Sequence, residues 1–387
     1  MRFLFHRGFS FFKQESASSI VLILSTLLSF ILANSGWASA FESVWKLPVF
    51  QVDLRWVVNE ALMTLFFFVI GLELKRECVM GELRTASQAL KPKFAALGGV
   101  LVPALIFICL VPVHLHQGWA IPTATDIAFS LGVIRILGHW VSKKARIFLT
   151  ALAIMDDLAA VLVIALFYNN DLGGKGLLLA IISCLFLWII KMTSRFISDR
   201  LLVFGLIIAT ILLWTGLLLA HIHPILAGFI AAFFVPIRFK QKLSLEGIEK
   251  RLHGWVSFGV MPLFALANAG VVLDMSVFSG KNSLFSGIFF ALVVGKPVGI
   301  FCFTVIYEKI RSFYNKNEEK MPRRDLLVLG SFAGIGFTMS LFISQLAYKD
   351  TFLLSTAKLA IVIASLVAMM IGVFFALLFH KILHRNP

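Results

Sequence analysis

The chain has 387 residues, of which 59% are hydrophobic and only 14% are charged, and its mean hydropathy is +0.93. Soluble domains carry about 25% charged residues, so this composition excludes an ordinary water-soluble globule. A membrane-spanning helix needs about 20 mostly apolar residues, so the chain has room for about a dozen. The net charge of +15 would suit a nucleic-acid partner only if the basic residues formed one patch, and they are spread along the chain.

Twelve apolar stretches, bounded by charged residues, Gly or Pro, are predicted to cross the membrane as helices. In chain order they are 16–36, 56–77, 94–113, 119–138, 146–168, 176–194, 201–219, 222–236, 254–272, 284–307, 326–347 and 355–380. The sequence thus predicts an all-α polytopic membrane protein. No connection is long enough to separate domains, so residues 1–387 are expected to form one integral membrane domain.

Lys and Arg residues concentrate in alternate connections between the predicted spans, as in Lys75 and Arg76 after the second span and Lys143 and Lys144 after the fourth. By the positive-inside rule these connections and both termini face the cytoplasm, which requires an even number of crossings. The same distribution accounts for the high net charge, and no nucleic-acid partner is expected.

Asp156 and Asp157 occur near the middle of the fifth predicted span. A charge at the bilayer centre costs roughly 2.5–3.5 kcal/mol, so buried acids in a span are expected to be functional. Neighbouring helix residues point about 100° apart, but the two carboxylates can still flank one cavity. Such a pair can hold protons or a small hard cation. The alternative is a pair of structural, hydrogen-bonding acids.

Two predicted spans contain residues that interrupt a helix. In the fourth, Pro122, Thr123 and Thr125 precede Asp126, and in the eleventh Gly334 and Gly336 flank Ile335. Non-helical backbone at membrane depth survives only where protein or water satisfies it. The sequence therefore predicts two interrupted helices, although the glycines alone would also suit close helix packing.

Lys296 is a cation about halfway along the tenth predicted span, with Pro297 beside it. If the interrupted spans four and eleven cross, their half-helix ends meet near the midplane. The partial positive charge of the N-terminal ends is then balanced by an anion, and the partial negative charge of the C-terminal ends by a cation. Asp126 and Lys296 supply one of each. The breaks fall in the middle of spans 3–5 and 10–12, which start on opposite membrane sides, so an inverted repeat is expected. The alternative for Lys296 is an extended side chain that reaches the surface.

At these residues the sequence resembles the NhaA sodium/proton antiporter family of bacterial inner membranes, whose known architecture has inverted repeats with discontinuous helices. The matching stretches are 71–77 (GLELKRE), 118–122 (GWAIP), 124–130 (ATDIAFS), 151–157 (ALAIMDD), 262–270 (PLFALANAG), 295–299 (GKPVG) and 334–340 (GIGFTMS). They run from the second to the eleventh span, so the resemblance covers essentially the whole chain.

The resemblance implies an electrogenic, pH-regulated transporter, not an enzyme, that exchanges sodium or lithium for protons in pH and sodium homeostasis. By position, Asp157 resembles the principal cation-binding carboxylate and Asp156 its proton-carrying partner, which pairs with the lysine matched by Lys296. Asp126 and Thr125 match the crossing region. No cofactor is implied; the transported sodium is held by Asp157 and Asp156, and a homodimer in the inner membrane is expected.

The resemblance also links the cytoplasmic ends of the second and ninth helices to pH control. Glu73 and Glu77 match the acids of the first, and Glu249 and His253 match an acid and a histidine of the second. Lys250 stands where the best-known relative has a second histidine. Read from the sequence alone, these residues could equally be ordinary juxtamembrane charges.

Two other functions also use buried acids. In an intramembrane aspartyl protease two carboxylates share a proton across a catalytic water, but here they are neighbours on one helix and Lys296 has no role. A passive cation channel selects through rings of carbonyls or charges. Buried titratable acids with a compensating lysine suit proton-coupled transport better than either alternative.

Overall fold

The computed structural model describes residues 2–81, 84, 86–168, 173–194, 196–237, 244–273, 282–314 and 320–385. The chain forms two compact units, which are described separately. The first unit consists of Met1–Ser39, Thr85–Ala160 and Asn268–Pro387, and the second of Ala40–Arg84 and Val161–Ala267.

The first unit is built from long helices and from two helices that come in shorter pieces. Its helices are α1 (Arg2–Ala33), α5 (Ala86–Leu110), α6 (Ile127–Leu137), α7 (Lys143–Phe167, up to Ala160), α13 (Ser283–Phe290), α14 (Lys296–Tyr314), α15 (Arg323–Ala333), α16 (Phe337–Ala347) and α17 (Thr351–Arg385). A π-helical segment, Ala291–Gly295, joins α13 to α14 without a break.

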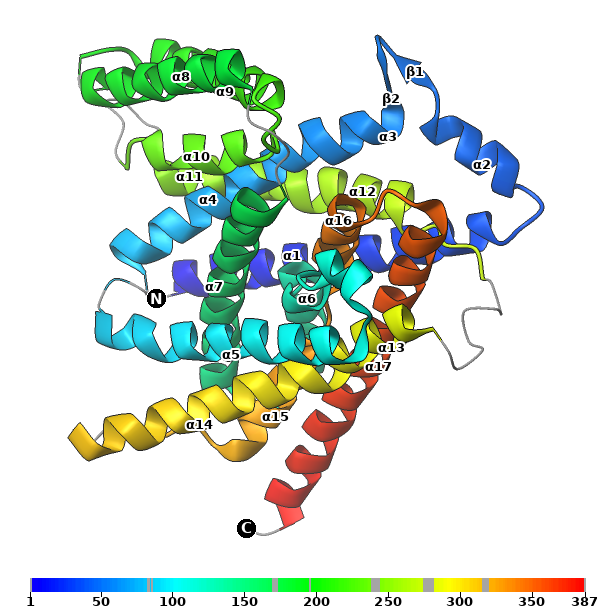
Figure 1. Cartoon of the computed structure of the whole chain (residues 1–387). Helices are drawn as coiled ribbons and strands as arrows, with labels where there is room; N and C mark the ends of the chain where they lie inside the picture. The colour runs from blue at the N-terminus through cyan, green and yellow to red at the C-terminus, as the bar shows by residue number, and fades with distance from the viewer. Residues whose placement is uncertain are drawn as a thin grey trace. The chain divides into compact units, whose positions relative to one another are not determined.

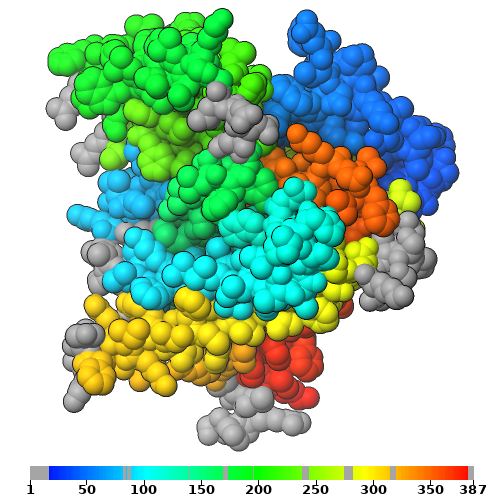
Figure 2. All heavy atoms as spheres, in the orientation of Figure 1, coloured from blue at the N-terminus to red at the C-terminus, as the bar shows by residue number. Residues whose placement is uncertain are grey.

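Helices α5 and α14 lie side by side along much of their length (Figure 1), and their side chains abut in the space-filling view (Figure 2). Glycines allow this approach: a Cβ atom at Gly295 would lie 3.0 Å from the Cα of Pro103, and one at Gly98 would overlap the carbonyl oxygen of Gly299. Small residues let helix backbones come close where no water drives association. The packing fixes α14, the helix that begins at Lys296, against α5.

The second unit contains the remaining helices and a short hairpin. Its elements are α2 (Ala38–Trp45), β1 (Pro48–Val49), β2 (Val52–Asp53), α3 (Leu54–Trp56), α4 (Met63–Met80), α8 (Gly174–Thr193), α9 (Asp199–Leu219), α10 (Leu226–Phe234), α11 (Leu245–Trp255) and α12 (Met261–Asn268). The π-helical segments Val57–Leu62 and Val256–Val260 join α3 to α4 and α11 to α12.

The hairpin of the second unit is not predicted from the sequence. Strands β1 and β2 pair antiparallel, with Val49 opposite Val52, and the turn places Phe50 at φ 59°. With two residues per strand, it is too short to show the period-2 pattern by which strands are recognised.

Among the described residues, seven helices are long and apolar enough to cross a membrane, or up to nine if each of two bent helix pairs counts as one span. The prediction of a polytopic, all-α membrane protein is thus confirmed at this level. The predicted span 222–236 corresponds to the nine-residue helix α10. Pro224 and Pro236 bound it, because proline lacks the N–H that would continue the helical ladder.

Helices α8 and α9 pack against each other (Figure 1) and expose large apolar side chains on their outer faces. Leu178, Ile181, Phe204 and Ile207 are between 53% and 61% exposed. Exposed apolar surface on this scale is unusual on a soluble monomer. It is the surface expected of helices that face lipid.

Candidate functional site

The structure interrupts the helices at the two places where the sequence predicts breaks. Before α6, the short 3₁₀ turn Ile121–Thr123 gives way to extended backbone at Ala124, and the helix starts at Ile127. Helix α15 ends at Ala333, and α16 starts at Phe337 with a bend of 47°. Both breaks belong to the first unit.

The two breaks are hydrogen-bonded to each other. The backbone N–H of Asp126 donates to the carbonyl oxygen of Ile335 at 2.7 Å. The hydroxyl of Ser130 donates to the carbonyl oxygen of Phe332 at 2.8 Å. From the other side, the hydroxyl of Ser340 donates to the carbonyl oxygen of Ile121 at 2.7 Å. Each break therefore satisfies buried backbone groups of the other, as non-helical backbone away from water requires.

Asp126 lies where two helix N-termini converge. It is 1% exposed and caps α6, because one carboxylate oxygen accepts the N–H of Phe129 at 3.0 Å. The other oxygen accepts the N–H of Thr338, in the first turn of α16, at 3.0 Å, together with the Thr338 hydroxyl. Helix N-termini carry partial positive charge, so a carboxylate at this point balances both.

Lys296 is fully buried at the first residue of α14. Its ammonium group donates to Oδ2 of Asp156 and to Oγ1 of Thr125. A buried ammonium needs both an opposite charge and hydrogen-bond acceptors, and these two residues provide them. The structure thus brings together three residues that are far apart in the sequence.

Thr125 is the centre of this group. Its hydroxyl oxygen lies 2.5 Å from Oδ2 of Asp156 and 2.9 Å from the carbonyl oxygen of Ala333, at the end of α15. A hydroxyl carries one proton and can accept in addition. Thr125 can therefore donate to only one of these oxygens at a time while it accepts from Lys296.

Asp156 and Asp157 lie on α7 and are each 2% exposed. The Oδ1 atom of Asp156 is buried and has no hydrogen-bond partner among the described residues. A Cβ atom at Gly99 on α5 would be 3.9 Å away from it. A buried oxygen without a partner is exceptional in proteins and requires an explanation. It is an available acceptor for a proton or a cation.

The available ligands are oxygen atoms. In the described part of the chain, no three side chains of His, Cys, Asp or Glu are grouped closely enough to hold a metal ion together. A cation at Asp156 and Asp157 would share their carboxylates with hydroxyl or backbone oxygens such as those at Thr125. Oxygen ligands of this type suit hard cations rather than thiophilic metals.

The residues expected to respond to pH lie in the second unit, on α4 and α11. Arg76 connects these helices: its Nε lies 2.9 Å from Oε2 of Glu249, and its Nη2 lies 3.1 Å from Oε1 of Glu77. Glu73 is one turn before Glu77 on α4, and His253 is one turn after Glu249 on α11. The structure therefore brings Glu77 and Glu249 together through a shared arginine.

Glu249 is one acid of this cluster whose pKa is raised to near neutrality. Burial raises its pKa from 4.5 to about 7, while the adjacent Arg76 lowers it and the carboxylates of Glu73 and Glu77 raise it further. Its side chain is 12% exposed. A charge that appears near pH 7 between two helices is suited to a pH response.

The sequence reading missed Thr338, Ser130 and Arg76 as site residues. Thr338 and Ser130 lie inside the recognised motifs 334–340 and 124–130, but hydroxyl residues are common in spans and only the fold shows which carbonyl or carboxylate they reach. In the sequence, Arg76 contributes to the positive-inside topology signal. Its position between Glu73 and Glu77 was the available clue to an ion pair.

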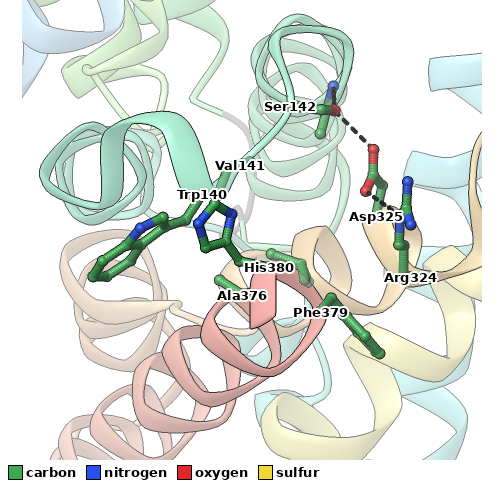
Figure 3. A pocket seen from close by; sticks show the side chains of 10 residues that line it. Trp140, Val141, Ser142, Arg324, Asp325, Ala376, Phe379 and His380 are labelled. Atoms are coloured by element: carbon green, nitrogen blue, oxygen red, sulfur yellow. Dashed lines mark hydrogen bonds and ion pairs between the residues drawn. The ribbon is translucent and has the colours of Figure 1, made fainter. Parts of the chain in front are cut away.

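A separate pocket of about 120 Å³ lies in the first unit beside the first turn of α15. Figure 3 shows Arg324 and Asp325 on one side, Trp140 and His380 on the other, and Ala376 and Phe379 of α17 below. The Ser142 hydroxyl, at the start of α7, donates to Oδ2 of Asp325 at 2.7 Å. None of the residues expected to bind ions lines this pocket.

Comparisons with known proteins cover nearly the whole chain. The family model described as Na+/H+ antiporter 1 matches residues 9–376. The Na(+)/H(+) antiporter NhaA of Escherichia coli (strain K12) is 39% identical over 381 residues, which are 94% of this chain and 95% of that protein. The same-named proteins of Citrobacter koseri and Shigella flexneri are 40% and 39% identical over the same shares. The chain therefore belongs to the Na+/H+ antiporter 1 family.

Proposed function

We propose that this protein exchanges sodium or lithium ions for protons across the bacterial inner membrane and thereby serves intracellular pH and sodium homeostasis. Membership of the Na+/H+ antiporter 1 family supports the reaction. One observation supports the location of the site: the buried Asp156 leaves one carboxylate oxygen without a partner beside Asp157, Thr125 and Lys296.

In the proposed mechanism, a cation and protons compete for Asp156 and Asp157. With the acids ionised, Asp157 is the principal sodium ligand. Asp156 then leaves Lys296 and becomes a second ligand of the same sodium ion. With protons bound, the carboxyl groups are poor ligands for sodium, and Asp156 accepts hydrogen bonds from Lys296 and Thr125 only through the oxygen that carries no proton. Because the two acids interact, the site titrates as a coupled set rather than residue by residue.

Electrogenic exchange follows if more protons than sodium ions cross in each cycle. Two carboxylates that both take protons but share one cation give such an imbalance. Apparent sodium affinity is then expected to fall as pH is lowered, because protons occupy the oxygens that sodium needs.

The proposed architecture is a single transporter domain of about 12 transmembrane helices with both termini in the cytoplasm. The hydrogen bonds between the two breaks support crossed, interrupted helices in spans 4 and 11. In that arrangement Asp126 compensates the N-terminal half-helix ends and Lys296 their C-terminal counterparts. Spans 3–5 and 10–12 form the inverted repeat, and the protein works as a homodimer.

The proposed pH control lies in the cluster on α4 and α11. As pH rises through about 7, Glu249 acquires a charge next to Arg76, Glu73 and Glu77, one helical turn from His253 on α11. The cluster becomes more negative, and a shift of the two helices follows if they have two conformations of different proton affinity.

Proteoliposomes test the proposed function. Sodium or lithium added to vesicles that carry an acid interior should dissipate the pH gradient, and a positive-inside or negative-inside membrane potential should change the rate, because net charge moves. A protease would leave the gradient intact and cleave a membrane peptide instead. With the membrane potential held at zero, a passive channel would carry sodium without moving protons.

A further inference from the structure

Glu308 is a buried carboxylate that the proposed ion-binding site does not use. It lies on α14, twelve residues after Lys296, and its side chain is 3% exposed. A buried charge persists only with partners that compensate its loss of water. Those partners come from other elements of the first unit.

Three donors surround Glu308. The ammonium group of Lys91 on α5 lies 2.7 Å from Oε1, and the backbone N–H of Met321 donates to the same atom at 2.8 Å. Arg323, the first residue of α15, donates to Oε2 at 3.2 Å. Its guanidinium also lies over the ring of Phe301, 5.9 Å from the centroid. Phe301 and Glu308 are seven residues apart and share one face of α14.

The first turn of α15 is also attached to α7. Asp325 accepts the hydroxyl of Ser142 at 2.7 Å (Figure 3), and Ser142 in turn accepts the N–H of Ala145 in the first turn of α7. This second attachment lies at the surface, where an interaction contributes less. The attached helices are the two that carry the charged groups of the site, Lys296 on α14 and Asp156 on α7.

The opposite end of α15 enters the site. Gly330 rests on α14 next to Lys296, since a Cβ atom at Gly330 would lie 2.8 Å from the Cα of Pro297. Three residues later, the carbonyl oxygen of Ala333 faces the hydroxyl of Thr125. A helix of eleven residues is about 16 Å long and moves as a rod, so the position of its first turn affects that of its last carbonyl.

We propose that Glu308 is a positioning residue for ion binding, which fixes the first turn of α15 on α14 through Arg323 and the Met321 amide and so sets where the Ala333 carbonyl meets Thr125. The inference rests on the proposed function. A role in folding alone would change the amount and stability of the protein but not its sodium dependence.

The experiment compares the full-length wild type with Glu308→Gln, Arg323→Gln and Arg323→Lys in proteoliposomes. Arg324→Gln is the matched control, because Arg324 is the next residue and contacts only Asp325 of its own turn, at 3.8 Å, among the ion pairs of the described residues. The sodium concentration for half-maximal proton flux is expected to rise about threefold or more in the two Gln variants, within the range of coupling through packed elements. Arg323→Lys should recover part of this change, and the control should match the wild type.

Glu308→Gln combined with Arg323→Gln should be little worse than Glu308→Gln alone, because Glu308→Gln already removes the ion pair with Arg323. Hydrogen–deuterium exchange of residues 323–333 provides a readout without transport: exchange should accelerate in the two Gln variants and not in Arg324→Gln. Because Arg323 is 47% exposed, its variants still decide the question if Glu308→Gln does not fold.

Unchanged sodium dependence together with unchanged exchange in α15 would overturn the inference, even if the protein yield falls. Absence of sodium-driven proton flux in the wild type would instead refute the proposed function. In that event, exchange in α15 still decides whether Glu308 fixes the helix.

Discussion

Replacing Lys296 with methionine removes a buried charge while nearly preserving the length of the side chain. In the wild type the ammonium group is fully buried and donates to Oδ2 of Asp156 and to Thr125. In the variant, Oδ2 retains only the Thr125 hydroxyl at 2.5 Å, and Oδ1 has no hydrogen-bond partner among the described residues. The variant must either keep an uncompensated carboxylate or take up a proton.

The structure sets the scale of this cost. Removing one partner of a buried ion pair destabilises a protein by about 3–5 kcal/mol. Neutralising an aspartate side chain at pH 7 costs about 4 kcal/mol, since in water it ionises near pH 3.9 and each pH unit corresponds to about 1.4 kcal/mol. Proton uptake therefore limits the loss to about 4 kcal/mol at pH 7. At pH 5 the same arithmetic gives about 1.5 kcal/mol, so the difference from the wild type should shrink on acidification.

Thermal or denaturant unfolding of the purified protein in detergent, at pH 5 and pH 7, measures this difference. The control is the double variant Lys296→Met with Asp156→Asn, which should regain most of the stability because a neutral pair replaces the ion pair. Lys296→Arg should retain more stability than Lys296→Met, because it keeps the positive charge. A deficit of equal size at both pH values, or a double variant as unstable as the single one, would refute the reasoning.

Three further predictions follow from other parts of the structure. Asp157→Asn should abolish sodium-stimulated proton flux in proteoliposomes while leaving folded protein in the membrane. Normal flux would show that Asp157 does not bind the transported ion. Burial raises the pKa of Glu249 to about 7, so the stability that this group contributes is present below pH 4.5 and is lost as pH rises through 7. Glu249→Gln should reduce this loss of stability in an unfolding series from pH 4 to 8, and it should shift the midpoint of the pH–activity profile. An unmoved midpoint would show that Glu249 is an ordinary juxtamembrane acid without a role in pH control. Gly330→Ala should lower stability by about 1–3 kcal/mol, because the Cβ atom would meet the Pro297 backbone at 2.8 Å, whereas Gly259→Ala, where nothing lies within 4 Å, should not.

The sequence alone determined the membrane class, the interrupted segments and the candidate charges. Long apolar stretches cannot be soluble surface, and charges within them are too costly to be incidental. Pro122 and the glycines around Ile335 identified both breaks because proline and glycine disfavour helix locally, without reference to tertiary contacts. The motifs around Asp126, Asp157 and Lys296 were specific enough to indicate the family.

The sequence could not determine helix lengths that depend on packing, or which polar groups meet. The π-helical segments at Val57–Leu62 and Ala291–Gly295 change the register of their helices without a signal in the apolar pattern. The residue pattern alone does not distinguish Asp156 from its neighbour Asp157. The family resemblance implies that Asp156 pairs with Lys296, and in the structure Asp156 contacts both Lys296 and Thr125.

The tertiary structure alone decided these contacts because they join residues in different segments of the fold that are fifteen or more positions apart. Thr125 reaches Ala333, Asp126 reaches Thr338, and Glu308 collects Lys91 and Arg323 from two other helices. Local propensity and hydrophobic period describe each helix by itself. The partner of a buried polar group is selected only when helices pack, because the cost of leaving that group unsatisfied then depends on what the neighbouring helix presents.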